Sequence, residues 1–329
     1  MHIVLLSNPK SGRNKHLQTI SELAQADTNI THFQASSIEQ FAQFVEQIRR
    51  SNVDIVVINA GDGTIQALLT LMFTHLPKLP LLAILKGGTT NMTGGDVGIH
   101  GNCITGLKKV MQWGKDPNRT TSTATRPVLK VDWDAPASPV CGMFFGTGAI
   151  IEGQDYFHSH ISKQGLRDSI GPALSALRLL FALNRTQEPL FSPVSMQISG
   201  WNEDTPETLT EQPTLESSGE HLLAFASGLE RLFLGIHPFW GTNNSQSSWY
   251  FTAVRHQPKG YSLLKLLPLV RGKPCREMTP EQGFLSAKLQ YLEMQLNGEF
   301  TVDGERYSTN PNNQMITVSL AGYATFLQL

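Results

Sequence analysis

The amino-terminal part of the chain repeats one pattern three times: a short apolar run, then a loop rich in glycine, serine and asparagine, then a helix-like segment. Strands that alternate with helices at this pitch predict a parallel α/β sheet, in which ligands bind at the carboxyl ends of the strands. All three loops would lie at that edge. The runs with their loops are Ile3–Ser7 with Asn8–Gly12, Ile55–Asn59 with Gly61–Thr64, and Leu81–Leu85 with Gly87–Asn91. Between the first two, Ile38–Arg49 places apolar residues at helical spacing.

The rest of the chain has a different pattern. The polar stretch Arg119–Thr123 is typical of a linker, and the runs after it alternate between apolar and polar residues, which predicts a mainly antiparallel β domain. These runs are Val128–Trp133, Trp249–Val254 and Met315–Leu320. Two helices are expected, at about Ile170–Leu183 and Leu263–Val270. The acidic segment Asn202–Glu220, which contains two prolines, is expected to be a solvated hairpin loop.

We therefore predict two domains. Residues 1–124 would form an α/β nucleotide-binding domain with a parallel sheet, and residues 125–329 a β-rich substrate domain whose last strand can return to the first domain. A length of 329 residues with 40% hydrophobic content is enough for two hydrophobic cores.

Charge and cysteine content exclude several classes of protein. The chain has 26 basic and 27 acidic side chains, so it lacks the net positive field that gathers nucleic acid, and no nucleic-acid partner is expected. Cys103, Cys141 and Cys275 are odd in number and far apart, which predicts neither a disulfide framework nor a CxxC metal site. A reducing compartment fits this pattern best.

Membrane insertion is not expected from the sequence. The amino terminus lacks a basic region followed by a long apolar region, so we expect no secretion signal. The apolar segment Pro172–Leu183 carries Arg178 and is shorter than the roughly 20 residues of a membrane span. We expect a cytoplasmic protein that meets the inner membrane face, if at all, as a peripheral protein; the oligomeric state cannot be inferred from the sequence.

The loop Gly61–Thr64 is the first candidate site. It ends a strand and opens a helix expected at Ile65–Met72, so it supplies free backbone N–H groups and the positive end of a helix dipole to an anion. Asp62 adds a carboxylate that could hold Mg²⁺ or accept a hydroxyl proton. The alternative is a plain strand-to-helix turn, in which aspartate makes local hydrogen bonds.

The loop Lys86–Gly95 favours the first of these interpretations, because it again follows a buried strand and again combines glycines with hydroxyl groups. Asn8, Ser11 and Gly12 supply a third set of donors. Neither a GxxxxGK[ST] nor a GxGxxG sequence occurs, so a phosphate site here would depend on backbone donors and metal.

These motifs resemble a known family. Asn8-Pro9-Lys10-Ser11-Gly12, Gly61-Asp62-Gly63-Thr64 and Gly88-Thr89-Thr90-Asn91 are similar to the NPxSG, GGDGT and GTxN signatures of the diacylglycerol kinase catalytic family, which includes sphingosine kinases and bacterial lipid kinases. The resemblance continues in Gly146-Thr147-Gly148, in Lys163–Leu180, in Val302-Asp303-Gly304-Glu305, which is similar to the DGE element, and in the closing strands. It thus spans nearly the whole chain.

The resemblance implies an ATP-dependent lipid kinase that uses Mg²⁺ and transfers the γ-phosphate to a hydroxyl of a diacylglycerol, a sphingosine or a related lipid. It implies Asp62 as the nucleotide-site or metal carboxylate, and Asp303 or Glu305 as the base that activates the acceptor hydroxyl; the choice between the two stays open. The residues implied for ATP binding are Asn8, Ser11, Gly12, Gly61, Gly63, Thr64, Gly88, Thr89 and Asn91.

Several positions depart from the family pattern. Ala60 stands for the first glycine of GGDGT, Ala67 for a glutamate, Met92 for the aspartate of GTxND, and Lys86 for a proline. Where the family has an acidic turn that helps form a structural metal site, this chain has Asn243–Ser245, so we expect that site to be weak or missing. Two alternatives therefore remain: a kinase for a soluble acceptor, as in NAD kinases, or a nucleotide- or lipid-binding protein that has lost catalysis.

Overall fold

The architecture is taken from a computed structural model that describes residues 1–12, 16–116, 120–156, 192–202, 212–232, 235–240, 248–257 and 278–329. The chain divides into two compact units. The first unit comprises Met1–Arg126 and Gly322–Leu329, and the second comprises Pro127–Ala321. The helices expected at 170–183 and 263–270, and the turn at 243–245, lie outside the described residues.

The first unit is built on a parallel sheet. Its strands β1 (Ile3–Ser7), β2 (Ile30–Gln34), β3 (Ile55–Ala60) and β4 (Leu81–Lys86) lie in the order β4-β3-β1-β2. Helices cover both faces of such a sheet, which is why β1 and β3 are continuous apolar runs without alternation. The end of β15 (Met315–Gln328) pairs in parallel with β4. The predicted α/β domain with a parallel sheet is confirmed.

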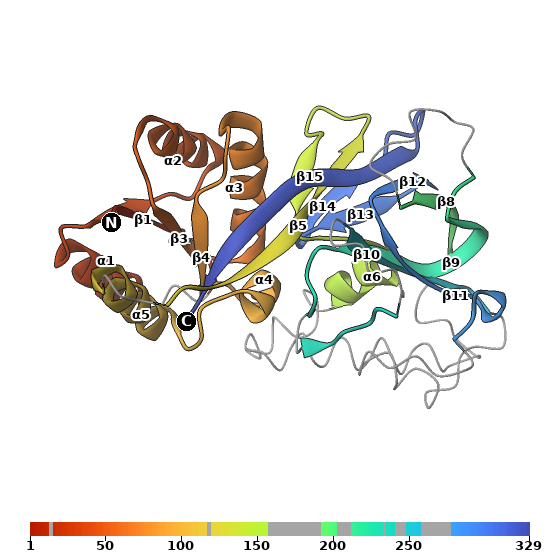
Figure 1. Ribbon diagram of the computed structural model, residues 1–329. Helices are drawn as coiled ribbons and strands as arrows, with labels where there is room; N and C mark the ends of the chain where they lie inside the picture. The colour runs from red at the N-terminus through yellow and green to blue at the C-terminus, as the bar shows by residue number, and fades with distance from the viewer. Residues whose placement is uncertain are drawn as a thin grey trace. The chain divides into compact units, whose positions relative to one another are not determined.

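Four helices flank this sheet (Figure 1). The helices α1 (Leu17–Gln25) and α5 (Cys103–Lys115) pack on one face, and α2 (Ile38–Arg50) and α3 (Asp62–His75) on the other. A fifth, α4, is a single turn at Met92–Asp96. The helix after β3 begins at Asp62, not at Ile65 as expected. Gly61 takes the N-cap position, and an aspartate is favourable in the first turn because it faces the positive end of the helix dipole.

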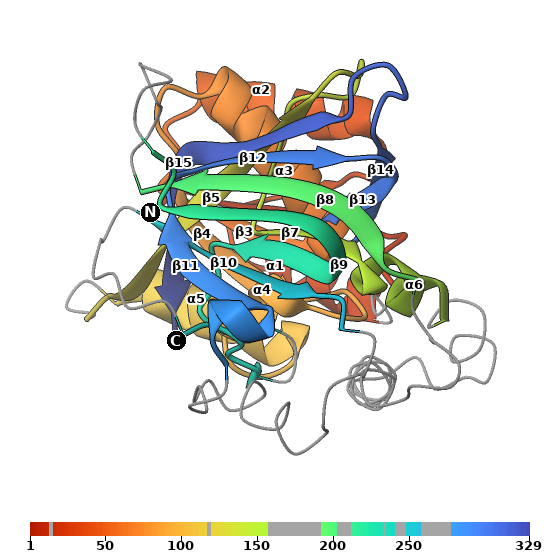
Figure 2. The same ribbon diagram turned by 90° about the vertical axis from the view of Figure 1, so that its right-hand side faces the viewer.

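The second unit is mainly antiparallel, as predicted. Its strands follow the order β14-β13-β7-β9-β8-β12-β15; β10 pairs with β9 and β11, and β5 pairs with β6 and β15. Figure 2 shows β12, β8 and β9 side by side. The bounds are β5 (Ser122–Trp133), β6 (Val140–Gly142), β7 (Phe144–Gly148), α6 (Ala149–Tyr156), β8 (Val194–Trp201), β9 (Leu215–Ser227), β10 (Trp249–Arg255), a 3₁₀ turn (Pro280–Gln282), β11 (Phe284–Leu289), β12 (Tyr291–Leu296), β13 (Glu299–Val302) and β14 (Glu305–Ser308).

Two segments expected to be irregular are partly strand. β5 already begins at Ser122, within the polar stretch interpreted as a linker. β9 begins at Leu215, so the end of the acidic segment pairs with β8, and residues 203–211 lie outside the described residues. Composition gave the wrong prediction in both places, because pairing with a neighbouring strand satisfies the backbone hydrogen-bonding groups of polar segments as well as those of apolar ones.

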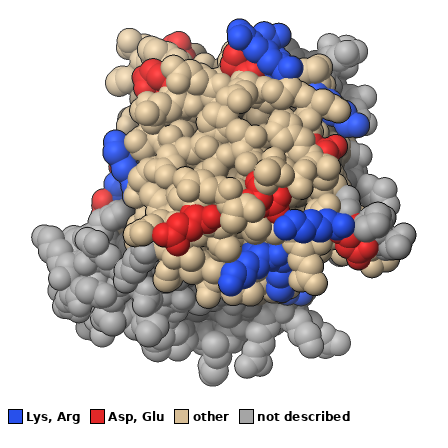
Figure 3. Space-filling view, turned by 90° about the vertical axis from the view of Figure 1, so that its left-hand side faces the viewer, with Lys and Arg blue, Asp and Glu red and all other residues tan. Residues whose placement is uncertain are grey.

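Two further features concern the surface and the helices. Figure 3 shows a face of the molecule on which basic and acidic side chains both occur, in keeping with the balanced composition. Within the part of the chain that the structure describes, no helix is long and apolar enough to cross a membrane.

Candidate phosphate-binding site

The loops after β1, β3 and β4 meet at the carboxyl edge of the parallel sheet. The side-chain amide of Asn8 donates a hydrogen bond to the Thr64 hydroxyl at 2.8 Å. The backbone N–H of Gly61 donates to the Ser11 hydroxyl at 3.1 Å. The first loop is therefore joined to the second by two side chains that the sequence analysis selected for phosphate contact.

Glycines allow these loops to approach one another closely. A Cβ atom added to Gly88 would lie 2.4 Å from the Cα atom of Gly61, and one added to Gly12 would lie 2.7 Å from the Thr89 hydroxyl oxygen. No real Cβ atom tolerates contacts this short. Gly88 is therefore required by the packing of loop on loop, whereas an added Cβ at Gly61 would make a tight contact of 3.3 Å with the Gly88 Cα and one at Gly12 would displace the Thr89 hydroxyl.

Asn91 closes the third loop on itself. Its side-chain oxygen accepts the N–H of Gly88 at 2.7 Å, and its side-chain nitrogen donates to the Gly88 carbonyl at 2.6 Å. Its backbone is left-handed, with φ of 49°, a conformation that asparagine adopts more readily than most residues. The Asn91 side chain therefore holds the loop in shape. The groups that the loop can offer an anion are its backbone N–H groups.

Asp62 joins the second loop to the third. Its side chain is buried, and its two oxygens accept the backbone N–H groups of Met92 and Thr93, both at 3.0 Å. Burial raises the pKa of the Asp62 carboxyl above its ordinary value, and the hydrogen bonds from Met92 and Thr93 oppose that rise. Because both oxygens accept hydrogen bonds, the carboxylate form fits this position and holds the start of α4.

These contacts do not fit a metal ligand. Mg²⁺ is usually bound by one or two accessible carboxylates together with phosphate oxygens and water. Among the described residues, no three histidine, cysteine, aspartate or glutamate side chains lie close enough to hold a metal ion. The metal role of Asp62 remains a prediction.

The loops do leave an arrangement that suits phosphate. α3 begins at Asp62, so the N–H groups of Asp62 and Gly63 have no acceptor within the helix. Gly61, Gly63 and Thr89 are partly exposed, whereas Thr64 and Gly88 are buried. Partly exposed glycines at a helix N-terminus beside two further loops have the backbone chemistry that suits an anion.

Asp303 and Glu305 lie in the second unit, in the hairpin of β13 and β14. Asp303 and Gly304 form its two-residue turn with φ of 49° and 95°, as Asp-Gly turns between antiparallel strands require. The Asp303 side chain is buried and accepts the Met143 N–H at 2.8 Å, whereas Glu305 is exposed. The structure therefore separates two carboxylates that the sequence could not rank.

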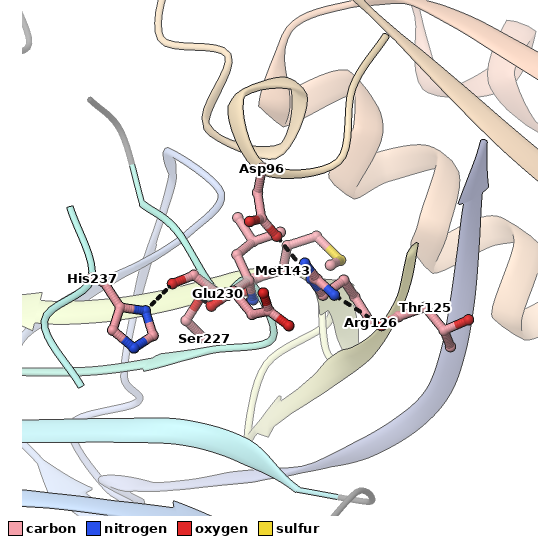
Figure 4. Close-up of polar contacts among 8 residues, drawn as sticks. Asp96, Thr125, Arg126, Met143, Ser227, Glu230 and His237 are labelled. Carbon is pink, nitrogen blue, oxygen red and sulfur yellow. Dashed lines mark hydrogen bonds and ion pairs between the residues drawn. The ribbon is translucent and has the colours of Figure 1, made fainter. Parts of the chain in front are cut away.

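One charged pair was not predicted from the sequence. Asp96, the last residue of α4, forms an ion pair with the Arg126 guanidinium at 2.8 Å, and the two side chains are only 2% and 13% exposed (Figure 4). Figure 4 also shows the Arg126 guanidinium donating to the Thr125 carbonyl. The residues of the Asp96–Arg126 pair are thirty positions apart and belong to no motif, so the sequence held no signal for it.

The sequence of the first unit was compared with models of known families. Residues 2–121 match the diacylglycerol kinase catalytic domain. The resemblance inferred from the three motifs is thus confirmed for the segment that carries the candidate site.

Solved structures of related architecture cover the whole chain. Three structures of a diacylglycerol kinase or proposed diacylglycerol kinase from Bacillus anthracis strain Sterne align over 99%, 100% and 99% of this chain and 96%, 97% and 96% of theirs, with TM-scores of 0.60, 0.64 and 0.65. Their sequence identities are 15%, 15% and 16%. At this identity the likeness concerns the fold alone. No curated protein matches the sequence significantly.

The departures from the diacylglycerol kinase pattern have local explanations in part. Ala60 is buried at the end of β3, where a methyl group is accommodated, and Met92 is buried while its N–H still bonds to Asp62. Both positions therefore serve the packing of the loops. Nothing in the described contacts explains Ala67 on α3.

Proposed function

We propose that this protein transfers the γ-phosphate of ATP to the hydroxyl group of a diacylglycerol, a sphingosine or a related lipid. The first unit would bind the triphosphate through the loops after β1, β3 and β4, and the second would bind the acceptor. In the transfer, the acceptor oxygen bonds to the γ-phosphorus, the bond from that phosphorus to the bridging oxygen of ADP breaks, and the hydroxyl proton passes to a carboxylate.

The observation that carries the proposal is the joining of three glycine-containing loops at one edge of the sheet, in a segment that matches the diacylglycerol kinase catalytic domain. Phosphoryl transfer depends mainly on positioning the phosphates and on stabilising their charge. Loops fixed to one another by Asn8, Ser11 and Asp62 provide backbone donors with little freedom to move, which supports such a role.

We propose Glu305 as the carboxylate that accepts the hydroxyl proton. A base must reach its substrate, and Glu305 is exposed, whereas Asp303 is buried and its carboxylate accepts a backbone N–H. Asp303 would then act by holding the turn that presents Glu305.

The test is a lipid-panel assay with γ-labelled ATP and Mg²⁺. The purified protein is incubated with diacylglycerols, sphingoid bases and a total lipid extract in mixed micelles, and products are identified by mass spectrometry. We expect one phosphorylated lipid class, and a loss of about 10²–10⁴-fold in its formation in Glu305→Gln, a typical contribution of a general base. Glu305→Gln should unfold at the wild-type temperature because the side chain is exposed.

Parallel reactions with NAD and fructose 6-phosphate distinguish the alternatives. Labelling of either soluble acceptor in place of lipid would replace the proposal with a soluble-acceptor kinase. Saturable ATP binding, seen as a rise in unfolding temperature with ATP concentration, together with no labelled product would indicate a protein that has lost catalysis.

A further inference from the structure

The loop Gly87–Asn91 is continuous with α4, a single helical turn. A helix this short has little stability of its own, so its orientation depends on what holds its two ends. At its start, the N–H groups of Met92 and Thr93 bond to the buried Asp62 carboxylate. The geometry of the loop is therefore linked to that of α4.

The other end of α4 is held by charge. Asp96 closes the helix, and its nearly inaccessible carboxylate pairs with the Arg126 Nε atom at 2.8 Å (Figure 4). Arg126 lies on β5 at the last position of the first unit before Pro127. The neighbouring Thr125 hydroxyl contacts the Thr325 hydroxyl of β15 at 3.2 Å, so Arg126 extends from a strand that is itself anchored in the unit.

The return of the chain after α4 is equally tight. A Cβ atom on Gly98 would lie 2.4 Å from the Gly94 carbonyl oxygen, and the Ile99 N–H bonds to the Ile84 carbonyl of β4 at 3.0 Å. These contacts fix the start of α4 and the chain that follows it, so the last residue of the helix, Asp96, is the remaining point at which α4 is held. The Asp96–Arg126 pair provides the contact at that point.

From this geometry we propose that Asp96 and Arg126 are positioning residues for nucleotide binding: they act through α4 to hold the loop Gly87–Asn91 in the shape that contacts the phosphates. The inference rests on the proposed function, because it assumes that this loop binds ATP. Neither Asp96 nor Arg126 is proposed to contact the nucleotide.

The test measures binding of a non-hydrolysable ATP analogue, adenosine 5′-(β,γ-imido)triphosphate with Mg²⁺, by isothermal titration calorimetry. We expect Arg126→Gln to weaken binding about tenfold, a typical strength of coupling between linked elements. Arg126→Lys, which keeps the charge, should recover part of the affinity. In turnover, KM for ATP should rise while KM for the acceptor stays unchanged.

A matched control is Lys115→Gln. Lys115 pairs at 2.8 Å with Asp27, another inaccessible carboxylate of the same unit, which lies just before the amino end of β2 and thus away from the loops. Each variant leaves a buried aspartate without its cation, so both should lower the unfolding temperature. Only Arg126→Gln should weaken analogue binding, and Lys115→Gln should stay within about twofold of wild type.

Two outcomes would overturn the proposal, and a second variant covers a failure of the first to fold. Wild-type affinity in folded Arg126→Gln overturns the positioning role and leaves the proposed function intact. Absence of analogue binding by the wild-type protein overturns both. If Arg126→Gln does not fold, the double variant Asp96→Asn/Arg126→Gln, which leaves no buried charge, takes its place with the same expected weakening.

Discussion

Asp62 and Asp303 are buried aspartates that came from two different motifs and do the same kind of work. Each carboxylate accepts backbone N–H groups from a segment distant in sequence: Met92 and Thr93 for Asp62, and Met143 for Asp303. Hydrogen bonds to a charged acceptor are stronger than neutral ones, and their loss leaves buried donors unsatisfied. Two residues that the sequence predicts as catalytic or metal-binding carboxylates are thus found to hold the backbone of the candidate site in place.

Replacement of Asp303 separates holding the turn from accepting a proton. Asp303→Ala should destabilise the protein by about 1–3 kcal/mol, because the buried Met143 N–H loses its acceptor and alanine disfavours a positive φ. Asp303→Asn keeps both an acceptor and a tolerance for this backbone, so it should cost clearly less. Urea unfolding followed by tryptophan fluorescence measures both; equal midpoints for alanine and asparagine would contradict the assignment.

Among the elements, the three loops after β1, β3 and β4 form one packed assembly. Contacts between glycine backbones bring the second and third loops together, and Asn8 and Ser11 tie the first loop to the second. Close packing of this kind tolerates an added methyl group poorly.

Gly88→Ala is the corresponding change at the element scale. Its methyl group would meet the Gly61 Cα atom at 2.4 Å, so we expect a loss of roughly 1–3 kcal/mol in stability and weakened ATP binding. Gly95→Ala on the neighbouring turn is the control, because an added Cβ there meets nothing within 4 Å. Thermal unfolding with and without ATP compares the two; equal behaviour would mean that the loops are not tightly joined.

For the whole molecule, the chain leaves the first unit at Arg126 and returns to it at Gly322. The returning strand places Phe326 opposite Leu82 of β4, and Ala324, Phe326 and Leu327 are completely buried. The first unit is therefore built from both ends of the sequence, and the segment that matches the kinase domain, residues 2–121, does not include all of its core.

Truncation tests this organisation. Residues 1–126 alone should be unstable or aggregate. Removal of one buried phenylalanine side chain costs about 3–5 kcal/mol of stability, and β4 loses its neighbouring strand β15. Joining residues 322–329 to residue 126 through a flexible linker should restore a cooperative unfolding transition, whereas the same fusion with Phe326→Ala and Leu327→Ala should not. Cooperative unfolding of residues 1–126 without the strand would disprove this view of the unit.

Local pattern alone predicted the three strands that precede the glycine-rich loops, the glycine-rich character of those loops, and the change to antiparallel strands in the second unit. The runs at 3–7, 55–59 and 81–85 are strands because residues buried on both faces of a parallel sheet must be apolar without interruption, and the glycine-rich loops follow at their carboxyl ends as expected. The tertiary structure decided which groups meet. Asp62 bonds to residues thirty positions away, Asp96 pairs with Arg126, and burial separates Asp303 from Glu305. These partners depend on strand order and on loop packing, which bring distant segments together and which hydrophobic periodicity does not encode.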